Sequence, residues 1–204
     1  ELFANRIGGN QFGKDTKIYK FQKIKNAKDD ALKANPGVEI LDFGIGEPDE
    51  IACEVIRERL KVEVDKPENR FYADNGIQEY KDAASKYLKN LYGIDIDPQT
   101  EIIHGIGSKP ILAMLPLVFI NPGDISILTV PGYPVLGTHT NYLGGEVFNV
   151  KLEKKNGFLP VLEDIPTDIA KKAKLFYINY PNNPTGAGAD KKFFQKMVEF
   201  AKKY

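Results

Sequence analysis

The sequence has a single cysteine, no net charge and no long hydrophobic run. With Cys53 alone, an internal disulfide framework and a metal cluster built from cysteines are both excluded. The 28 Lys and Arg side chains balance 28 Asp and Glu side chains, so the basic excess typical of nucleic-acid-binding proteins is absent. The longest apolar run, residues 111–120, is too short to span a bilayer and contains Pro116. We therefore expect no nucleic-acid partner, no membrane association and, because the two histidines lack the spacing of ligands, no metal site.

The composition is that of a globular protein, and the two ends suggest a longer one. Hydrophobic residues make up 42% and charged residues 27% of the 204 residues, close to globular averages. Residues 1–14 are polar and glycine-rich, unlike a secretory signal, so we expect a cytoplasmic protein. The chain begins with Glu1 rather than Met, and it ends at Tyr204 inside a helical apolar pattern without a stop signal. Truncation and a frayed C-terminal helix both fit this pattern, and truncation is the stronger expectation.

Strand patterns alternate with helix patterns along most of the chain. Strands are predicted at residues 38–45, 100–105, 125–130, 146–152 and 174–180. Helices are predicted at residues 51–64, 77–92, 109–120, 134–143 and 163–173 and from residue 190 onward. The first ~35 residues, with scattered Gly and Lys, indicate an arm or loop outside the sheet. This alternation predicts an α/β fold, in which a mostly parallel sheet carries helices on both faces.

A glycine-rich turn at residues 105–110 links one predicted strand to the next helix. Gly107 lets the backbone approach an anion, Ser108 can cap the helix and donate a hydroxyl, and Lys109 adds a full positive charge. The helix N-terminus contributes free N–H groups and a partial positive charge. The turn lacks the third glycine of the dinucleotide fingerprint, where Pro110 stands, and the spacing of a Walker loop. A phosphate site and an ordinary tight turn with a capping serine therefore both remain open.

Two proline-rich loops each follow directly on a predicted strand. In the first, Pro131 and Pro134 flank Tyr133, which makes that ring a rigid plate suited to stacking on a planar ligand. In the second, residues 180–186, an asparagine amide can donate to a ligand oxygen. Both loops fall beyond the carboxyl ends of strands, where open parallel sheets bind ligands. Taken singly, each loop is equally compatible with a purely structural turn.

Together these motifs resemble those of class I/II aminotransferases, the fold type I pyridoxal-phosphate enzymes. They are Gly-Ser-Lys at 107–109, Pro-Gly-Tyr-Pro at 131–134 and Asn-Pro-Thr-Gly at 183–186. Residues 44–49 also resemble the Gly-Glu-Pro segment of that family, and residues 71–76 resemble its Tyr-to-Gly segment. The likeness extends over nearly the whole chain from about residue 15. Residues 72–76 and 18–21 are similar to LL-diaminopimelate aminotransferases in particular.

The resemblance implies that this chain binds pyridoxal 5'-phosphate. Gly107, Ser108 and Lys109 would hold the cofactor phosphate. Tyr133 would stack on the pyridine ring, and Asn183 would donate to its phenolic oxygen. Together these contacts would orient the ring against the bond that reacts.

The resemblance also implies substrate contacts and a homodimer with a shared active site. Tyr72 would reach the cofactor phosphate of the neighbouring subunit, although many relatives place this tyrosine where Phe71 stands. Gly46 would present a backbone N–H near the substrate α-carboxylate. Asp74 would pair with the distal ammonium of a diamino acid. The alternative interpretation is that Asp74 is a solvated turn residue without a ligand.

The implied activity is transfer of an amino group between an amino acid, LL-diaminopimelate for this subfamily, and 2-oxoglutarate, in lysine biosynthesis. The resemblance implies no catalytic residue within this chain. Beyond Tyr204 would lie the Schiff-base lysine of the family, the acidic residue that contacts the pyridine nitrogen, and the arginine that binds the substrate carboxylate. The sequence therefore resembles an N-terminal half. Residues 1–48 would form an N-terminal arm and part of a small domain, and residues 49–204 would form part of the large domain.

Three other functions remain compatible with this resemblance. Another amino-acid aminotransferase or a carbon–sulfur lyase would share the fold type and the cofactor. An aminotransferase-like sensor domain of a transcriptional regulator would need a DNA-binding domain, and this chain contains none of its sequence signals.

Overall fold

The computed structural model describes residues 2–14, 20–44 and 46–204, and the chain divides into two compact units. One unit comprises residues 1–12 and 78–204, and the other comprises residues 13–77. The smaller unit holds the helices α1 (Lys20–Ala34) and α2 (Glu54–Val64). The larger unit holds the helices α3 (Gln78–Tyr92), α4 (Ser108–Phe119), α5 (Val135–Tyr142), α6 (Thr167–Lys172) and α7 (Lys191–Lys203). Short 3-10 turns lie at Asn5–Ile7, Gly9–Gln11, Pro67–Arg70, Lys154–Asn156 and Leu162–Asp164.

The larger unit is built on a parallel sheet, as the alternating pattern predicts. Among the described residues its strands are β1 (Ile125–Val130), β2 (Glu146–Lys151) and β3 (Ala173–Tyr177), in the order β2-β1-β3. Leu128 of β1 lies opposite Asn149 of β2 and Tyr177 of β3. The central strand is buried along Ile125–Thr129, which explains why its sequence is mostly apolar and carries no charge, because parallel strands are covered on both faces.

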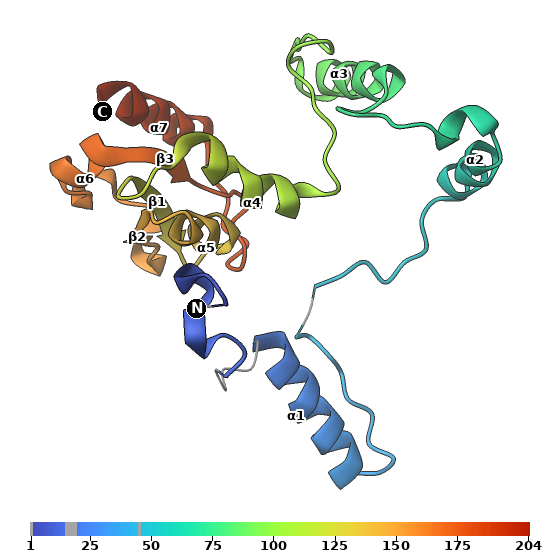
Figure 1. Cartoon of the computed structure of the whole chain (residues 1–204), viewed down its shortest axis with the longest axis horizontal. Coiled ribbons are helices and arrows are strands. Elements are labelled where there is room, and N and C mark those ends of the chain that lie inside the picture. The colour runs from blue at the N-terminus through green and yellow to red at the C-terminus, as the bar shows by residue number, and fades with distance from the viewer. Residues whose placement is uncertain (1, 15–19, 45) are drawn as a thin grey trace. The chain divides into compact units, whose positions relative to one another are not determined.

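The connections place helices on both faces of this sheet (Figure 1). From β1 the chain runs through α5 to β2 on one side, and from β2 it returns past β1 through α6 to β3 on the other side. Because both crossovers take the same hand, this reversal of direction puts α5 and α6 on opposite faces. On one face, α5 packs so closely on β1 that a Cβ added to Gly137 would lie 2.9 Å from Leu128 Cδ2.

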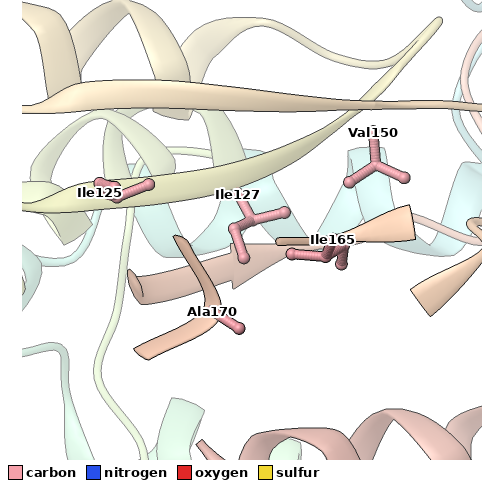
Figure 2. Close-up of a cluster of buried hydrophobic side chains, with 5 residues drawn as sticks. All are labelled: Ile125, Ile127, Val150, Ile165 and Ala170. Carbon is pink, nitrogen blue, oxygen red and sulfur yellow. The ribbon is translucent and has the colours of Figure 1, made fainter. Parts of the chain in front are cut away.

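The hydrophobic core lies on the other face, between the sheet and the helices α6 and α7. Figure 2 shows its buried side chains, which are Ile125, Ile127, Val150, Ile165 and Ala170. Phe176 of β3 meets Phe200 of α7 edge to face, with ring centroids 5.9 Å apart. Burying each of the isoleucine and valine side chains stabilises the fold by roughly 1.5–3 kcal/mol. These contacts fix α7 beside the sheet.

Helix α7 begins where the sequence predicts. Asp190 is its N-cap, and the Asp190 carboxylate accepts a hydrogen bond from the Phe193 N–H over 2.8 Å. Phe193 and Met197, four residues apart, are the buried positions of the helix. The cap and this spacing together account for the start and the orientation of α7.

Two predicted strands and one predicted loop are wrong. Residues 38–44 and 100–105 have no strand structure, and Ile45 and the segment at 15–19 lie outside the described residues. In the described part of the chain neither segment has a strand beside it, and Ile103 is exposed, so local strand propensity finds no ladder to join. The N-terminal ~35 residues contain the helix α1 rather than only an arm or loop, because the polar i,i+4 pair Gln22 and Asn26 and its neighbours support a helical turn.

Within the described residues, no helix combines the length and the apolar character needed to cross a membrane. The same residues contain no cluster of three His, Cys, Asp or Glu side chains placed to hold a metal ion.

The buried hydroxyl pair between β1 and α5 generates a stability prediction. Thr140 donates to the Leu136 carbonyl over 3.0 Å, which leaves Ser126 to donate to Thr140 over 2.9 Å. Both hydroxyls are fully buried. Thr140→Val should therefore lower the free energy of unfolding by about 1–3 kcal/mol, because it strands the Ser126 donor in the core. Adding Ser126→Ala to that variant should restore part of the loss, as measured by urea unfolding.

The matched control is Thr138→Val on the same helix. Thr138 makes the same kind of bond, to the Pro134 carbonyl over 3.2 Å, but its side chain is exposed. That substitution should change the unfolding free energy by no more than about 0.5 kcal/mol. Equal losses from both threonine substitutions would contradict the prediction.

Candidate functional site

The carboxyl ends of β1 and β3 are the place where two of the sequence motifs, the Tyr133 loop and the Asn183 loop, meet. These strands are neighbours in the sheet, and both run in the same direction. The helix that follows β1 is α5, on one face, and the helix that follows β3 is α7, on the other face. Chains that leave adjacent parallel strands toward opposite faces open a crevice at the carboxyl ends, where open α/β sheets bind ligands. The loops that carry Tyr133 and Asn183 both start at this crevice.

The loop after β1 folds tightly back on the end of its strand. A Cβ added to Gly132 would lie 2.2 Å from the Thr129 carbonyl oxygen, so only glycine fits this close approach. The next residue, Tyr133, is half-buried, with proline on the far side. The ring of Tyr133 is therefore carried by a backbone with little freedom to move.

The loop after β3 carries two asparagines in different environments. Asn182 is 2% exposed, whereas Asn183 is exposed. The Asn183 backbone N–H donates to Asn179 Oδ1 over 3.3 Å, and Asn182 Nδ2 donates to the Pro131 carbonyl over 3.4 Å. The second bond joins the two loops, so the structure brings together the Tyr133 and Asn183 segments that the sequence pairs by motif order.

Proline geometry in both loops matches an expectation from the sequence. The family resemblance and the tight ligand-facing loops predict cis peptide bonds at Val130–Pro131 and Asn183–Pro184. Both bonds are cis, which confirms that prediction. Tyr180–Pro181 is also cis, which the sequence reasoning missed.

Two tyrosines beside the crevice were not singled out from the sequence. Burial raises the pKa of the Tyr177 hydroxyl above its usual range, and the neighbouring Tyr133 hydroxyl raises it further. Burial also raises the pKa of Tyr180, whose hydroxyl donates to the Phe158 carbonyl over 2.8 Å. Both phenols therefore stay protonated at neutral pH. The only sequence signal for Tyr177 is its place at the end of an apolar strand.

The N-terminus of α4 has the features of an anion site. Gly107 is the N-cap, and its backbone, with φ 74° and ψ 172°, lies in a region that essentially only glycine occupies. No side chain accepts from the first-turn N–H groups in the described structure, and Ser108 and Lys109 are exposed beside them. The expectation that Ser108 caps the helix is wrong, because α4 begins at Ser108 itself and Gly107 takes the cap position.

These residues fit a phosphate group. The uncapped N–H groups of a twelve-residue helix supply donors and a partial positive charge. Ser108 adds a hydroxyl donor and Lys109 adds an ammonium group on the same turn. Helix α4 packs against α5, the helix that follows the Tyr133 loop, so both belong to the larger unit.

The three remaining candidate residues belong to the smaller unit. Gly46, Tyr72 and Asp74 are all exposed there, and the alternative tyrosine position Phe71 is exposed as well. A Cβ added to Gly46 would meet nothing within 4 Å, so its backbone is open to approach. Within this unit the structure leaves each of these side chains or backbone groups available to a ligand.

Known proteins resemble this chain in both sequence and fold. The family described as aminotransferase class I and II matches residues 38–204. The chain is 58% identical over 201 residues to the LL-diaminopimelate aminotransferase of Methanocaldococcus jannaschii. The aligned region covers 98% of this chain and 48% of that protein. The chain is 53% identical over 201 residues to the enzyme of the same name from Methanococcus maripaludis, again covering 98% of the chain and 48% of that protein.

A solved structure shows the same arrangement. Substrate-bound BacF from Bacillus subtilis superposes with a TM-score of 0.86 at 31% identity, covering 100% of this chain and 50% of that one. The chain thus spans about half the length of the relatives that it matches. Its motifs, its parallel sheet and these matches together show that the chain belongs to the class I and II aminotransferase family.

Proposed function

We propose that this chain supplies the N-terminal half of a pyridoxal-phosphate-dependent aminotransferase. The observation that carries the proposal is the joining of the Tyr133 and Asn183 loops at the carboxyl ends of β1 and β3. The reaction is transfer of an amino group from LL-diaminopimelate to 2-oxoglutarate, in lysine biosynthesis. Relatives that carry the name LL-diaminopimelate aminotransferase, at 58% and 53% identity, support this choice of substrate.

Each part of the cofactor has a partner in the larger unit. The N–H groups that follow Gly107, the Ser108 hydroxyl and the Lys109 ammonium hold the phosphate. The Tyr133 ring stacks on the pyridine ring, and the exposed Asn183 amide donates to the phenolic oxygen. When bound, the cofactor supplies an electron sink for the bond that breaks at the amino-acid Cα. The protein contributes the orientation of that ring.

Three further candidate residues carry the substrate contacts and the contact with a second copy. A backbone N–H at Gly46 binds the α-carboxylate, and the Asp74 carboxylate pairs with the distal ammonium of the diamino acid. Tyr72 reaches the cofactor phosphate of a second copy, which makes a homodimer the working form. We place this enzyme in the cytoplasm. In domain terms, residues 1–48 form the arm and part of a small domain, and residues 49–204 form part of the large domain.

A substrate panel on the longer protein that carries this chain tests the proposal. LL-diaminopimelate with 2-oxoglutarate should give glutamate faster than any other amino donor in the panel. A different preferred donor would indicate another aminotransferase. Release of ammonia and a 2-oxo acid without consumption of 2-oxoglutarate would indicate a lyase. Cofactor binding without turnover of any donor would favour a sensor domain.

Stacking by Tyr133 should matter more for cofactor affinity than the Tyr72 hydroxyl. Tyr133→Ala removes an aromatic plate, worth about 0.5–1.5 kcal/mol beyond its buried area. Tyr72→Phe removes one hydroxyl that, in this chain, is fully exposed. In the full-length enzyme that carries this chain, the dissociation constant for pyridoxal phosphate, measured by equilibrium dialysis, should therefore rise more for Tyr133→Ala. As a control, Tyr142→Ala at the exposed end of α5 should leave the constant unchanged. Equal or reversed changes at positions 133 and 72 would overturn the ranking.

The 204-residue chain alone should not transaminate. Lys109 is the only lysine in a ligand motif, and it serves the phosphate end of the cofactor rather than the aldehyde. Without a positioned amine the proton transfer loses its general base, typically worth ~10²–10⁴ in rate. Borohydride treatment with pyridoxal phosphate should leave no lysine stoichiometrically labelled, as measured by mass spectrometry. Robust turnover of diaminopimelate, or stoichiometric labelling of one lysine, would contradict this expectation.

A further inference from the structure

Asn182 differs from its neighbour Asn183 in being closed off from any ligand. The side chain of Asn182 is 2% exposed, whereas Asn183 is open to solvent. A buried amide is retained in a loop only if its donors and its acceptor find partners, because an unpaired buried polar group is costly. The partners of Asn182 therefore indicate what this residue does.

Within its own loop, Asn182 closes a tight ring of hydrogen bonds. Its Oδ1 accepts from the Thr185 hydroxyl over 2.8 Å and from the Thr185 N–H over 3.3 Å. The Gly186 N–H donates to the Asn182 carbonyl over 2.7 Å, and the Asn182 N–H donates to the Ala187 carbonyl over 2.8 Å. These bonds hold the Asn182 side-chain oxygen in one place relative to the loop backbone.

Because the amide group is planar, fixing its oxygen also fixes the direction of its nitrogen. That nitrogen, Nδ2, donates to the Pro131 carbonyl, 51 residues away in the chain. Pro131 lies two residues before Tyr133, and Asn182 lies one residue before Asn183. The bond therefore ties the backbone that carries the stacking ring to the backbone that carries the exposed amide.

We propose that Asn182 is a positioning residue that sets the separation between the Tyr133 ring and the Asn183 amide. The inference rests on the proposed function only for the identity of what is held, the flat pyridine ring of the cofactor. Asn182 itself touches no ligand. It acts through the Pro131 carbonyl, and Thr185 acts through Asn182.

Asn182→Asp separates the hydrogen bonds that Asn182 accepts within its own loop from the one that it donates to Pro131. The carboxylate keeps the oxygen that accepts from Thr185, but above its pKa it has no N–H to donate to Pro131. At pH 8, without any ligand, the ¹⁵N–¹H heteronuclear NOE of Gly132 and Tyr133 should fall, which reports a looser β1 loop. With pyridoxal phosphate, the dissociation constant should rise by about three- to ten-fold, the loss of one hydrogen bond.

Two further variants keep the test decisive. Asn149→Asp makes the same chemical change at an exposed position on β2 and should alter neither readout. Thr185→Val leaves Asn182 in place but removes the hydroxyl that orients its amide, and it should loosen Gly132 and Tyr133 in the same direction. It serves as the probe if the buried carboxylate prevents folding, which circular dichroism and thermal unfolding reveal.

The outcomes separate this inference from the proposed function. Unchanged NOE values at Gly132 and Tyr133 in both loop variants would overturn the coupling, whether or not the cofactor binds. Loosened loops with an unchanged dissociation constant would overturn the positioning role. If the unaltered longer protein that carries this chain binds no pyridoxal phosphate, the proposed cofactor fails, and the ligand-free NOE still decides whether Asn182 joins the loops.

Discussion

Strand β1 is hydrogen-bonded along both edges and buried on both faces, and the geometry of the site depends on that constraint. Because β2 and β3 both align with β1, the residues that follow each strand emerge at the same end of the sheet. Because α5 and α7 cover opposite faces, the two loops diverge as they leave and the crevice stays open between them. A central strand packed in this way cannot shift register without exposing Ile127, so the loops inherit its rigidity.

The sequence predicts the elements whose evidence is local. Helix α3 has a long amphipathic stripe and a glycine stop, and β1 has a short apolar run between turn residues, so periodicity alone identifies both. The segments at 38–45 and 100–105 have similar strand propensity but, within the described residues, no neighbouring strand. Pairing is a tertiary property, and single-sequence patterns do not contain it. The sequence pattern does not reveal helix α1, because its residues are mostly polar and scattered glycines precede it.

The candidate site divides in the same way. Motif order and placement after strands are enough to bring the Tyr133 and Asn183 loops together, and the proline bonds follow from the same motifs. The separate roles of Asn182 and Asn183 cannot be read from two adjacent identical residues, since burial alone distinguishes them. At Ser108 the residue type predicts the wrong cap position. A serine at the start of a helix is a good cap by residue type, but the unusual backbone of Gly107 shifts the helix start by one residue.

The outer edge of β3 is open to pairing in the described part of the chain. In the described part of the chain β3 pairs only with β1, so its other edge presents N–H and C=O groups without a strand beside them. Such an edge is a template for another chain. Helix α4 adds exposed Met114, Leu117 and Val118 on the same unit. In the longer protein that carries this chain, the open edge of β3 and this apolar face of α4 are therefore the places where further strands and helices would pack.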